Sequence, residues 1–172
     1  MGIIPDMPDN NNTGSYMKLR KGENKFRILG EGIAGFEWWV VDSEGKRRPM
    51  RARLTERPKD SELPLDENGE KTKLKIFLAL PVWNYAENQV QILEITQTSI
   101  RKALAALEAD SDWGDPTQYD LKIVKEGEGR ETTYSVAPTP HKKLDKNILE
   151  VYKNTTINLE ALFDGDNPFA EF

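Results

Sequence analysis

The stretch KLKIFLALPVWNY, residues 73–85, limits the possible folds more than any other part of the sequence. Its even-numbered positions from Leu74 to Val82 are all apolar. A β-strand sends alternate side chains to opposite faces, so this spacing predicts a strand with one face in a core. The odd-numbered positions include Lys73, Lys75, Phe77, Trp83 and Tyr85. We therefore expect the second face to present cations and aromatic rings to solvent.

The order of the predicted elements points to a fold class. Aromatic and β-branched runs predict strands at residues 25–29, 36–41, 47–54, 73–83, 89–96, 119–125 and 131–137. An apolar stripe at helical spacing predicts one helix at residues 99–109, and residues 146–153 could form a short second helix. Antiparallel strands with one helix before the last two give the order of the oligonucleotide-binding (OB) fold. We predict a mainly β, partly open OB barrel with one strand more than the minimal plan.

Gly30, Gly32 and Gly35 have the spacing G-x-G-x-x-G, which also occurs in dinucleotide-binding loops. Such a loop requires a helix to begin at the third glycine. Here FEWWVVD follows, which favours an extended strand. The glycines are instead expected to bend or bulge a strand, as a small barrel requires at its corners.

Composition divides the chain into three parts. Residues 1–16 are rich in Asn, Asp, Pro and Gly and are predicted to be a disordered N-terminal segment. Residues 17–160 form the predicted OB domain, with a polar loop at residues 56–72. Residues 161–172 are predicted to be a flexible acidic tail.

The charge is distributed unevenly along the chain. The net charge is −5, yet residues 18–57 carry 11 Lys and Arg against 6 Asp and Glu. A basic block in an acidic chain indicates a local anionic partner, or else only a solvated charged face. In RRPMRARL, Arg47, Arg51 and Arg53 share one face of the predicted strand.

Cations beside exposed aromatic rings suit single-stranded nucleic acid. Lys and Arg neutralise phosphates and aromatic rings stack on bases, so binding of this kind tolerates any sequence. The predicted contacts are Trp39, Arg47, Arg51, Arg53, Lys73, Lys75, Phe77, Trp83 and Tyr85. Two alternatives stay open. Trp38 and Trp39 point to opposite faces, so at least one belongs in a core, and a bulge at Pro81 would bury Trp83.

The acidic tail could act in two ways. It could occupy a cationic groove in competition with nucleic acid, or present Pro168, Phe169 and the terminal Phe172 to a partner protein, together with Asp164 and Asp166. A tail that only improves solubility is the third reading.

Several stretches resemble bacteriophage single-stranded DNA-binding proteins of the OB-fold type. These are GENKFRIL, KIFLALPVWNY, residues 92–129 and TTYSVAP, and the ending DGDNPF is similar to the acidic tail of bacterial single-stranded DNA-binding proteins. The resemblance implies coating of single-stranded DNA, or RNA, in replication, recombination and repair in the host cytoplasm. It also implies recruitment of replication or recombination proteins through the tail. The chain departs from the family because Ala170, Glu171 and Phe172 follow Pro-Phe.

Other classes of function find little support in the sequence. With no cysteine, one histidine and no paired carboxylates in a recognisable motif, we expect neither an enzyme nor a metal or other cofactor. No signal peptide or membrane span is expected. The alternative function is a protein-interaction module that uses the aromatic face and the tail. The sequence leaves the oligomeric state open.

Overall fold

The computed structural model describes residues 14–66 and 68–169. Seven strands form one antiparallel sheet, in the order β3-β2-β4-β1-β6-β7 with β5 paired to β4. The sheet is not closed, and the mainly β architecture is consistent with an OB-like fold. None of the helices in these two ranges is long and apolar enough to cross a membrane.

A long strand at residues 22–41, bent near its middle, organises the sheet. β1 (Gly22–Ile28) and β2 (Ile33–Val41) both pair with β4 (Lys75–Asn84), β1 along its second half and β2 along its first half. The predicted role is confirmed for Gly30 and Gly32, because the strand is interrupted at residues 29–32, whereas Gly35 lies within β2. At Gly32 an added Cβ would lie 2.5 Å from the carbonyl oxygen of Ala79, so the backbone approaches β4 too closely for a side chain.

The remaining elements follow the OB order. β5 (Gln89–Ile95) pairs with β4, α1 (Thr98–Ala109) comes next, and β6 (Asp120–Glu126) and β7 (Thr133–Pro138) form the last hairpin. α2 (Lys146–Lys153) follows. Short 3₁₀ turns lie at Leu54–Glu56, Asp60–Glu62, Pro116–Gln118, Gly129–Glu131 and Leu159–Asp164.

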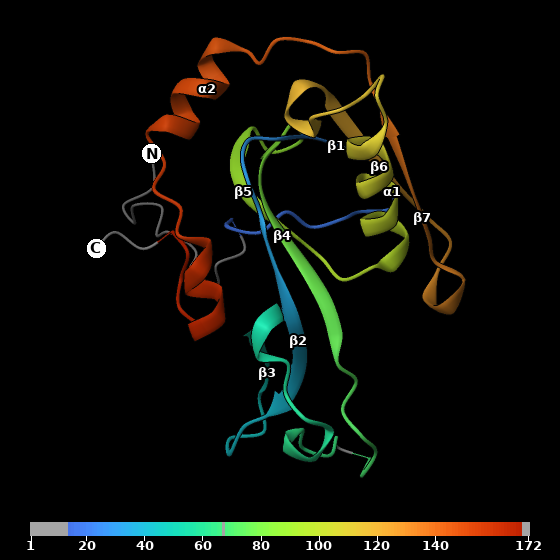
Figure 1. The fold of residues 1–172 in the computed structure, drawn as a ribbon, viewed down its shortest axis with the longest axis vertical. Coiled ribbons are helices and arrows are strands. Elements are labelled where there is room, and N and C mark those ends of the chain that lie inside the picture. Colours follow the sequence, from blue (N-terminus) through green and yellow to red (C-terminus); the bar gives the residue numbers. More distant parts are fainter. Residues whose placement is uncertain (1–13, 67, 170–172) are drawn as a thin grey trace, which may run out of the picture.

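The additional strand is β3 (Arg47–Arg53), which pairs with β2 at the edge of the sheet. Together with the polar loop after it, β3 belongs to a projection that we call the β-arm, residues 33–75. Figure 1 shows the β-arm extending downward from the rest of the sheet, the open barrel formed by β1, β4, β5, β6 and β7 with α1. In the OB plan this insertion falls between the first two strands, one of the places where such folds bind oligonucleotides.

Two hydrophobic cores lie on opposite faces of β4. Leu80 and Val82 belong to the barrel core, with α1 residues such as Ile100. Phe77 and Ala79 belong to a second core, which is covered by a segment that we call the C-terminal strap, residues 157–169. Within the strap, Leu162 is only 2% exposed.

This second core corrects the prediction for residues 73–85. Phe77 is fully buried and Trp83 is 8% exposed, so neither faces solvent as predicted. The alternation is confirmed from Phe77 to Val82, because Phe77 and Ala79 lie on the face opposite Leu80 and Val82. It is wrong for Ile76, which was expected on the core face and is 39% exposed. The physical reason for the error is that β4 is a central strand, and chain segments distant in sequence cover the side that was predicted to be open.

Both ends of the described chain are more ordered than the sequence indicated. Tyr16 forms a parallel bridge to Ile92 of β5, and residues 161–169 belong to the packed strap and not to a flexible tail. The apolar residues Ala161, Leu162 and Phe169 give this segment a face to bury, which its acidic composition concealed. Residues 1–13 and 170–172, including Phe172, lie outside the described residues.

Candidate nucleic-acid interface

The β-arm has one face that carries most of the predicted contacts. Register pairs Trp39 with Pro49, Glu37 with Arg51, and Gly35 with Arg53. β4 continues the same face, because Lys75 is opposite Glu37 and Phe77 is opposite Gly35. Strand register therefore brings Trp39, the β3 arginines and Lys75 together, although they are separated in sequence.

A groove of about 690 Å³ lies between this face and the strap, and we call it the arm groove. The arm contributes Trp39, Arg48 and Lys75 to the lining, and Thr96 follows β5. Residues 162–167 of the strap form another wall. The groove therefore combines an aromatic ring, cations and the acidic part of the strap.

Trp39 is the exposed aromatic residue of the groove. Its exposed fraction is 43%, and the guanidinium of Arg47 lies 5.5 Å from its ring centre. A second hollow, of about 220 Å³, adjoins Trp39, Val41 and Leu65 on the arm. Trp38, on the opposite face of β2, is half-buried. A large ring beside a cation and open to solvent can stack on a base while the cation meets a phosphate.

Arg51 lies in the floor of the groove and is 9% exposed. Its Nη2 donates to Glu94 Oε2 at 2.8 Å and lies 3.6 Å from Glu37 Oε1. Burial, together with the neighbouring Glu94 carboxyl, raises the pKa of Glu37 to about 8. Arg51 is therefore engaged by carboxyl groups, and the open phosphate contact predicted from the sequence does not exist in this arrangement.

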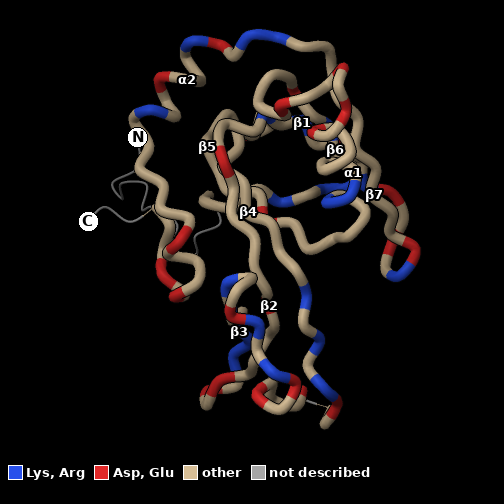
Figure 2. The backbone as a smooth tube through the Cα atoms, in the orientation of Figure 1, with Lys and Arg blue, Asp and Glu red and all other residues tan. Residues whose placement is uncertain are grey.

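Among the other predicted cations, one is paired with an acidic residue of the strap and three are exposed to solvent. Arg53 pairs with Glu160 of the strap at 3.1 Å, and its guanidinium lies 4.7 Å from the centre of the Phe163 ring. Arg47, Lys73 and Lys75 are exposed. Figure 2 shows Lys and Arg along β3 and on the segment entering β4, mixed with acidic residues in the loops of the arm.

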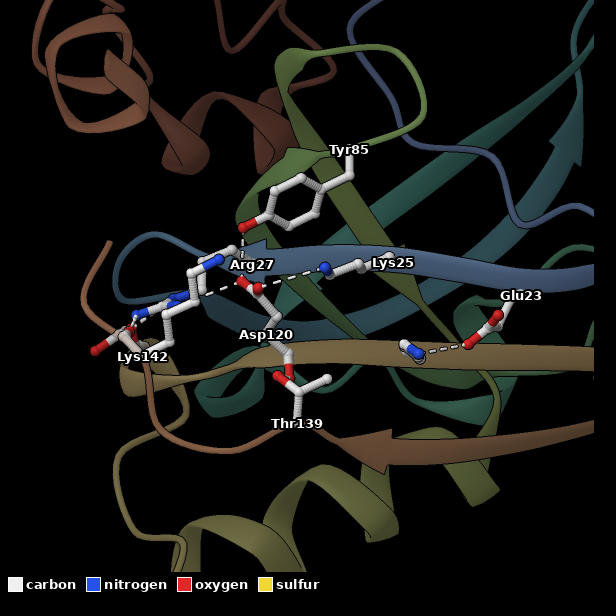
Figure 3. A network of polar contacts seen from close by, with 9 residues as sticks. Glu23, Lys25, Arg27, Tyr85, Asp120, Thr139 and Lys142 are labelled. Atoms are coloured by element: carbon white, nitrogen blue, oxygen red, sulfur yellow. Dashed lines mark hydrogen bonds and ion pairs between the residues drawn. The ribbon is translucent and has the colours of Figure 1, made fainter. Parts of the chain in front are cut away.

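Tyr85 is at the opposite end of β4 from Lys75, roughly 30 Å away along the strand. Its hydroxyl donates to Asp120 Oδ1 at 2.7 Å, and Lys25 lies 4.8 Å from its ring centre. Arg27 also donates to Asp120 and, through Nη2, to the carbonyl of Lys142 (Figure 3). This network fastens β1, β6 and the segment before α2 to one another, and it does not join Tyr85 to the arm groove.

The predicted tail residues divide into two groups. Asp164 and Asp166 are exposed and line the arm groove. Pro168 is buried and its carbonyl accepts from the backbone N–H of Asn158, while Phe169 packs against the second core. In this arrangement Pro168 and Phe169 are not presented to a partner.

Sequence reasoning missed four residues of this region: Glu37, Glu94, Tyr16 and Phe163. Glu37 left a signal, because it is an acid between apolar residues in a strand. The other three meet the groove only through tertiary packing.

Comparison with known proteins gives one informative relationship. The chain is 24% identical over 143 residues to a protein of Escherichia phage T5 described as a probable ssDNA-binding protein. The match covers 70% of this chain and 53% of the phage T5 protein, so the chain spans about half the length of that relative. No family model matches the chain, and no solved structure matches it.

Proposed function

We propose that this protein binds single-stranded DNA in the arm groove, without enzymatic activity and largely without regard to sequence. The observation that carries the proposal is the exposed ring of Trp39, which lines the arm groove together with Arg48 and Lys75. Arg47, in the adjoining smaller hollow, lies beside the same ring. The name of the phage T5 relative supports the same partner.

The chemistry of the groove accounts for tolerance of sequence. Every base offers a flat face to Trp39, and stacking of this kind is worth about 1–3 kcal/mol for each base. Cations hold the backbone by neutralising phosphates, which are the same at every position. The 2′-hydroxyl is the group that would distinguish RNA from DNA, so RNA is tested as a competitor.

The strap supplies the competing anions. Asp164 and Asp166 line the groove that phosphates would enter, so the proposal includes weak occlusion of the site by the protein's own carboxylates. Recruitment of replication or recombination proteins, as the resemblance implies, would use these exposed acids, because Pro168 is buried. From the same resemblance, we propose a role in phage DNA replication, recombination and repair.

Equilibrium titration with oligothymidine, followed by tryptophan fluorescence, tests the proposal. Affinity should fall as salt rises, with a logarithmic slope of about 0.7 for each neutralised phosphate. When a duplex and an oligoribonucleotide are added as competitors in the same titration, the duplex should be the weakest competitor for the oligothymidine. Absence of binding at low salt, or binding insensitive to salt, would reject the proposal and favour the protein-interaction module.

A further inference from the structure

The floor of the arm groove holds two carboxyl groups and a single guanidinium. Glu37 on β2 is 4% exposed, and the side chains of Arg51 on β3 and Glu94 on β5 are 9% and 18% exposed. β2 and β5 are not neighbours, since both pair with β4, which lies between them. The cluster therefore connects the β-arm to the barrel across β4.

The charges of this cluster do not balance without a proton. Two ionised carboxylates would face one Arg51 in a buried position, where like charges repel strongly. Lys75 is the other cation that acts on Glu37, but it is exposed on β4. Tyr16 adds no positive charge from the N-terminal segment, and the strap contributes Asp164 and Asp166 to the same groove. With Arg48 and Lys75 counted, the groove lining carries three cations against four carboxyl groups, so one carboxyl group is in excess.

Two buried atoms of the cluster lack a hydrogen-bond partner among the described residues, Glu94 Oε1 and Arg51 Nε. Glu94 Oε1 is buried and has no hydrogen-bond donor among the described residues, while Glu94 Oε2 accepts from Arg51. A protonated carboxyl group supplies one O–H donor. Glu37 Oε1 and Glu94 Oε2 lie 3.6 Å and 2.8 Å from the same Arg51 Nη2 atom, so the two carboxyl groups converge on one guanidinium. A proton on Glu37 satisfies the oxygen and makes the three-residue cluster neutral.

We propose that Glu37 and Glu94 share one proton at neutral pH, and that loss of this proton loosens the β-arm from the barrel and weakens the hold of the arm groove on single-stranded DNA. Ionisation of Glu37 sets two carboxylates against each other across β4, and it places a new negative charge in the floor of a groove that binds phosphates. The DNA half of this inference rests on the proposed function, whereas the shared proton does not.

Thermal unfolding against pH tests the shared proton without DNA. The folded protein retains a proton that the unfolded chain loses near the ordinary pKa of a glutamic acid, so stability falls as pH rises from about 4.5 to about 8 and levels off above it. Glu37→Gln supplies a permanent donor to Glu94 and should remove this part of the slope. Glu94→Gln should also remove it, because a single carboxyl then faces Arg51. Glu126→Gln, at an exposed position on β6, is the matched control and should keep the wild-type slope.

Infrared spectroscopy provides a second readout. The wild-type protein at neutral pH should show the carbonyl band of a protonated carboxylic acid, which disappears above about pH 9 and is absent in Glu37→Gln. Wild-type and Glu37→Gln unfolding curves that stay parallel over this range, or a spectrum without the band, would overturn the shared proton.

Titration with oligothymidine at about pH 6.5 and about pH 9 tests the DNA half. We expect roughly a fivefold loss of wild-type affinity at the higher pH and a much smaller loss in Glu37→Gln. Equal losses in both proteins would overturn the link between the proton and DNA. Failure of the oligonucleotide to bind at either pH would reject the proposed function instead, and the unfolding curves would still decide on the proton.

Discussion

At the scale of single residues, Trp39 is central because its ring is exposed and has the guanidinium of Arg47 beside it. Phe77 has the same aromatic character, but its ring packs against Phe163 with 5.9 Å between ring centres and is closed to solvent. The difference comes from the strap, which reaches Phe77 on β4 and leaves Trp39 open farther along the arm. If the protein binds DNA as proposed, exposure therefore favours Trp39 over Phe77 as the ring that stacks on a base.

Replacement of Trp39 by Ala tests this assignment. Loss of one stacked base should cost about 1–3 kcal/mol, which is roughly a 5- to 150-fold loss of affinity for oligothymidine. Val151→Ala on α2 is the control, because Val151 is 44% exposed and is not part of the groove lining. Affinity of Trp39→Ala equal to that of the control would remove Trp39 from the site. The thermal unfolding midpoint of Trp39→Ala should stay close to that of the wild-type protein.

At the scale of elements, the bent strand β1–β2 and the strap determine the shape of the groove. Gly35 lies where these two elements meet. A Cβ at this position would lie 2.5 Å from the Ala52 carbonyl oxygen and 2.8 Å from Cε1 of Phe163. The missing side chain therefore allows β3 and the strap to approach β2.

Gly35→Ala should lower the free energy of unfolding by about 1–3 kcal/mol, the usual cost of overpacking. Gly14→Ala is the matched control, because the nearest atom to its added Cβ is 3.8 Å away. Chemical denaturation with urea measures both variants. A Gly35→Ala protein as stable as Gly14→Ala would show that the close contact is not important for folding.

The strap makes a separate prediction. Asp164→Asn combined with Asp166→Asn should raise affinity for oligothymidine, by roughly fivefold at low salt and less at high salt, because two competing anions leave the groove. Asp112→Asn with Glu126→Gln removes the same charge from exposed positions that do not line the groove. If both double variants gain the same affinity, the effect comes from net charge alone. If the strap variant gains no affinity, occlusion by the strap is rejected.

The same elements show how far the sequence could be interpreted. Alternation and composition were sufficient to locate β1 to β7, α1, α2 and the glycine bend, because these features depend on local backbone preferences. They could not reveal that residues 157–169 return to cover Phe77, since that contact joins segments about 80 residues apart. Arg51 was misassigned for the same reason. Its partners Glu37 and Glu94 come from other strands, and only sheet register brings the three together.

At the scale of the whole molecule, the chain separates a barrel from an arm whose cations gather on β3 and on the segment entering β4. In the barrel, Lys25 and Arg27 are paired with Asp120, whereas the arm leaves Arg47, Lys73 and Lys75 exposed. An overall charge of −5 therefore does not oppose an anionic partner at the arm. Screening should shorten the range of repulsion from the acidic remainder to about 10 Å at 0.1 M salt, while contacts within the groove persist.

Photo-cross-linking of an oligonucleotide that carries halogenated uracil, followed by mass spectrometry of the peptides, locates the bound strand most directly. The account predicts cross-links to the peptide that contains Trp39, and their loss in Trp39→Ala. Cross-links confined to α2 or to the β6–β7 hairpin, with none on residues 33–53, would contradict binding in the arm groove.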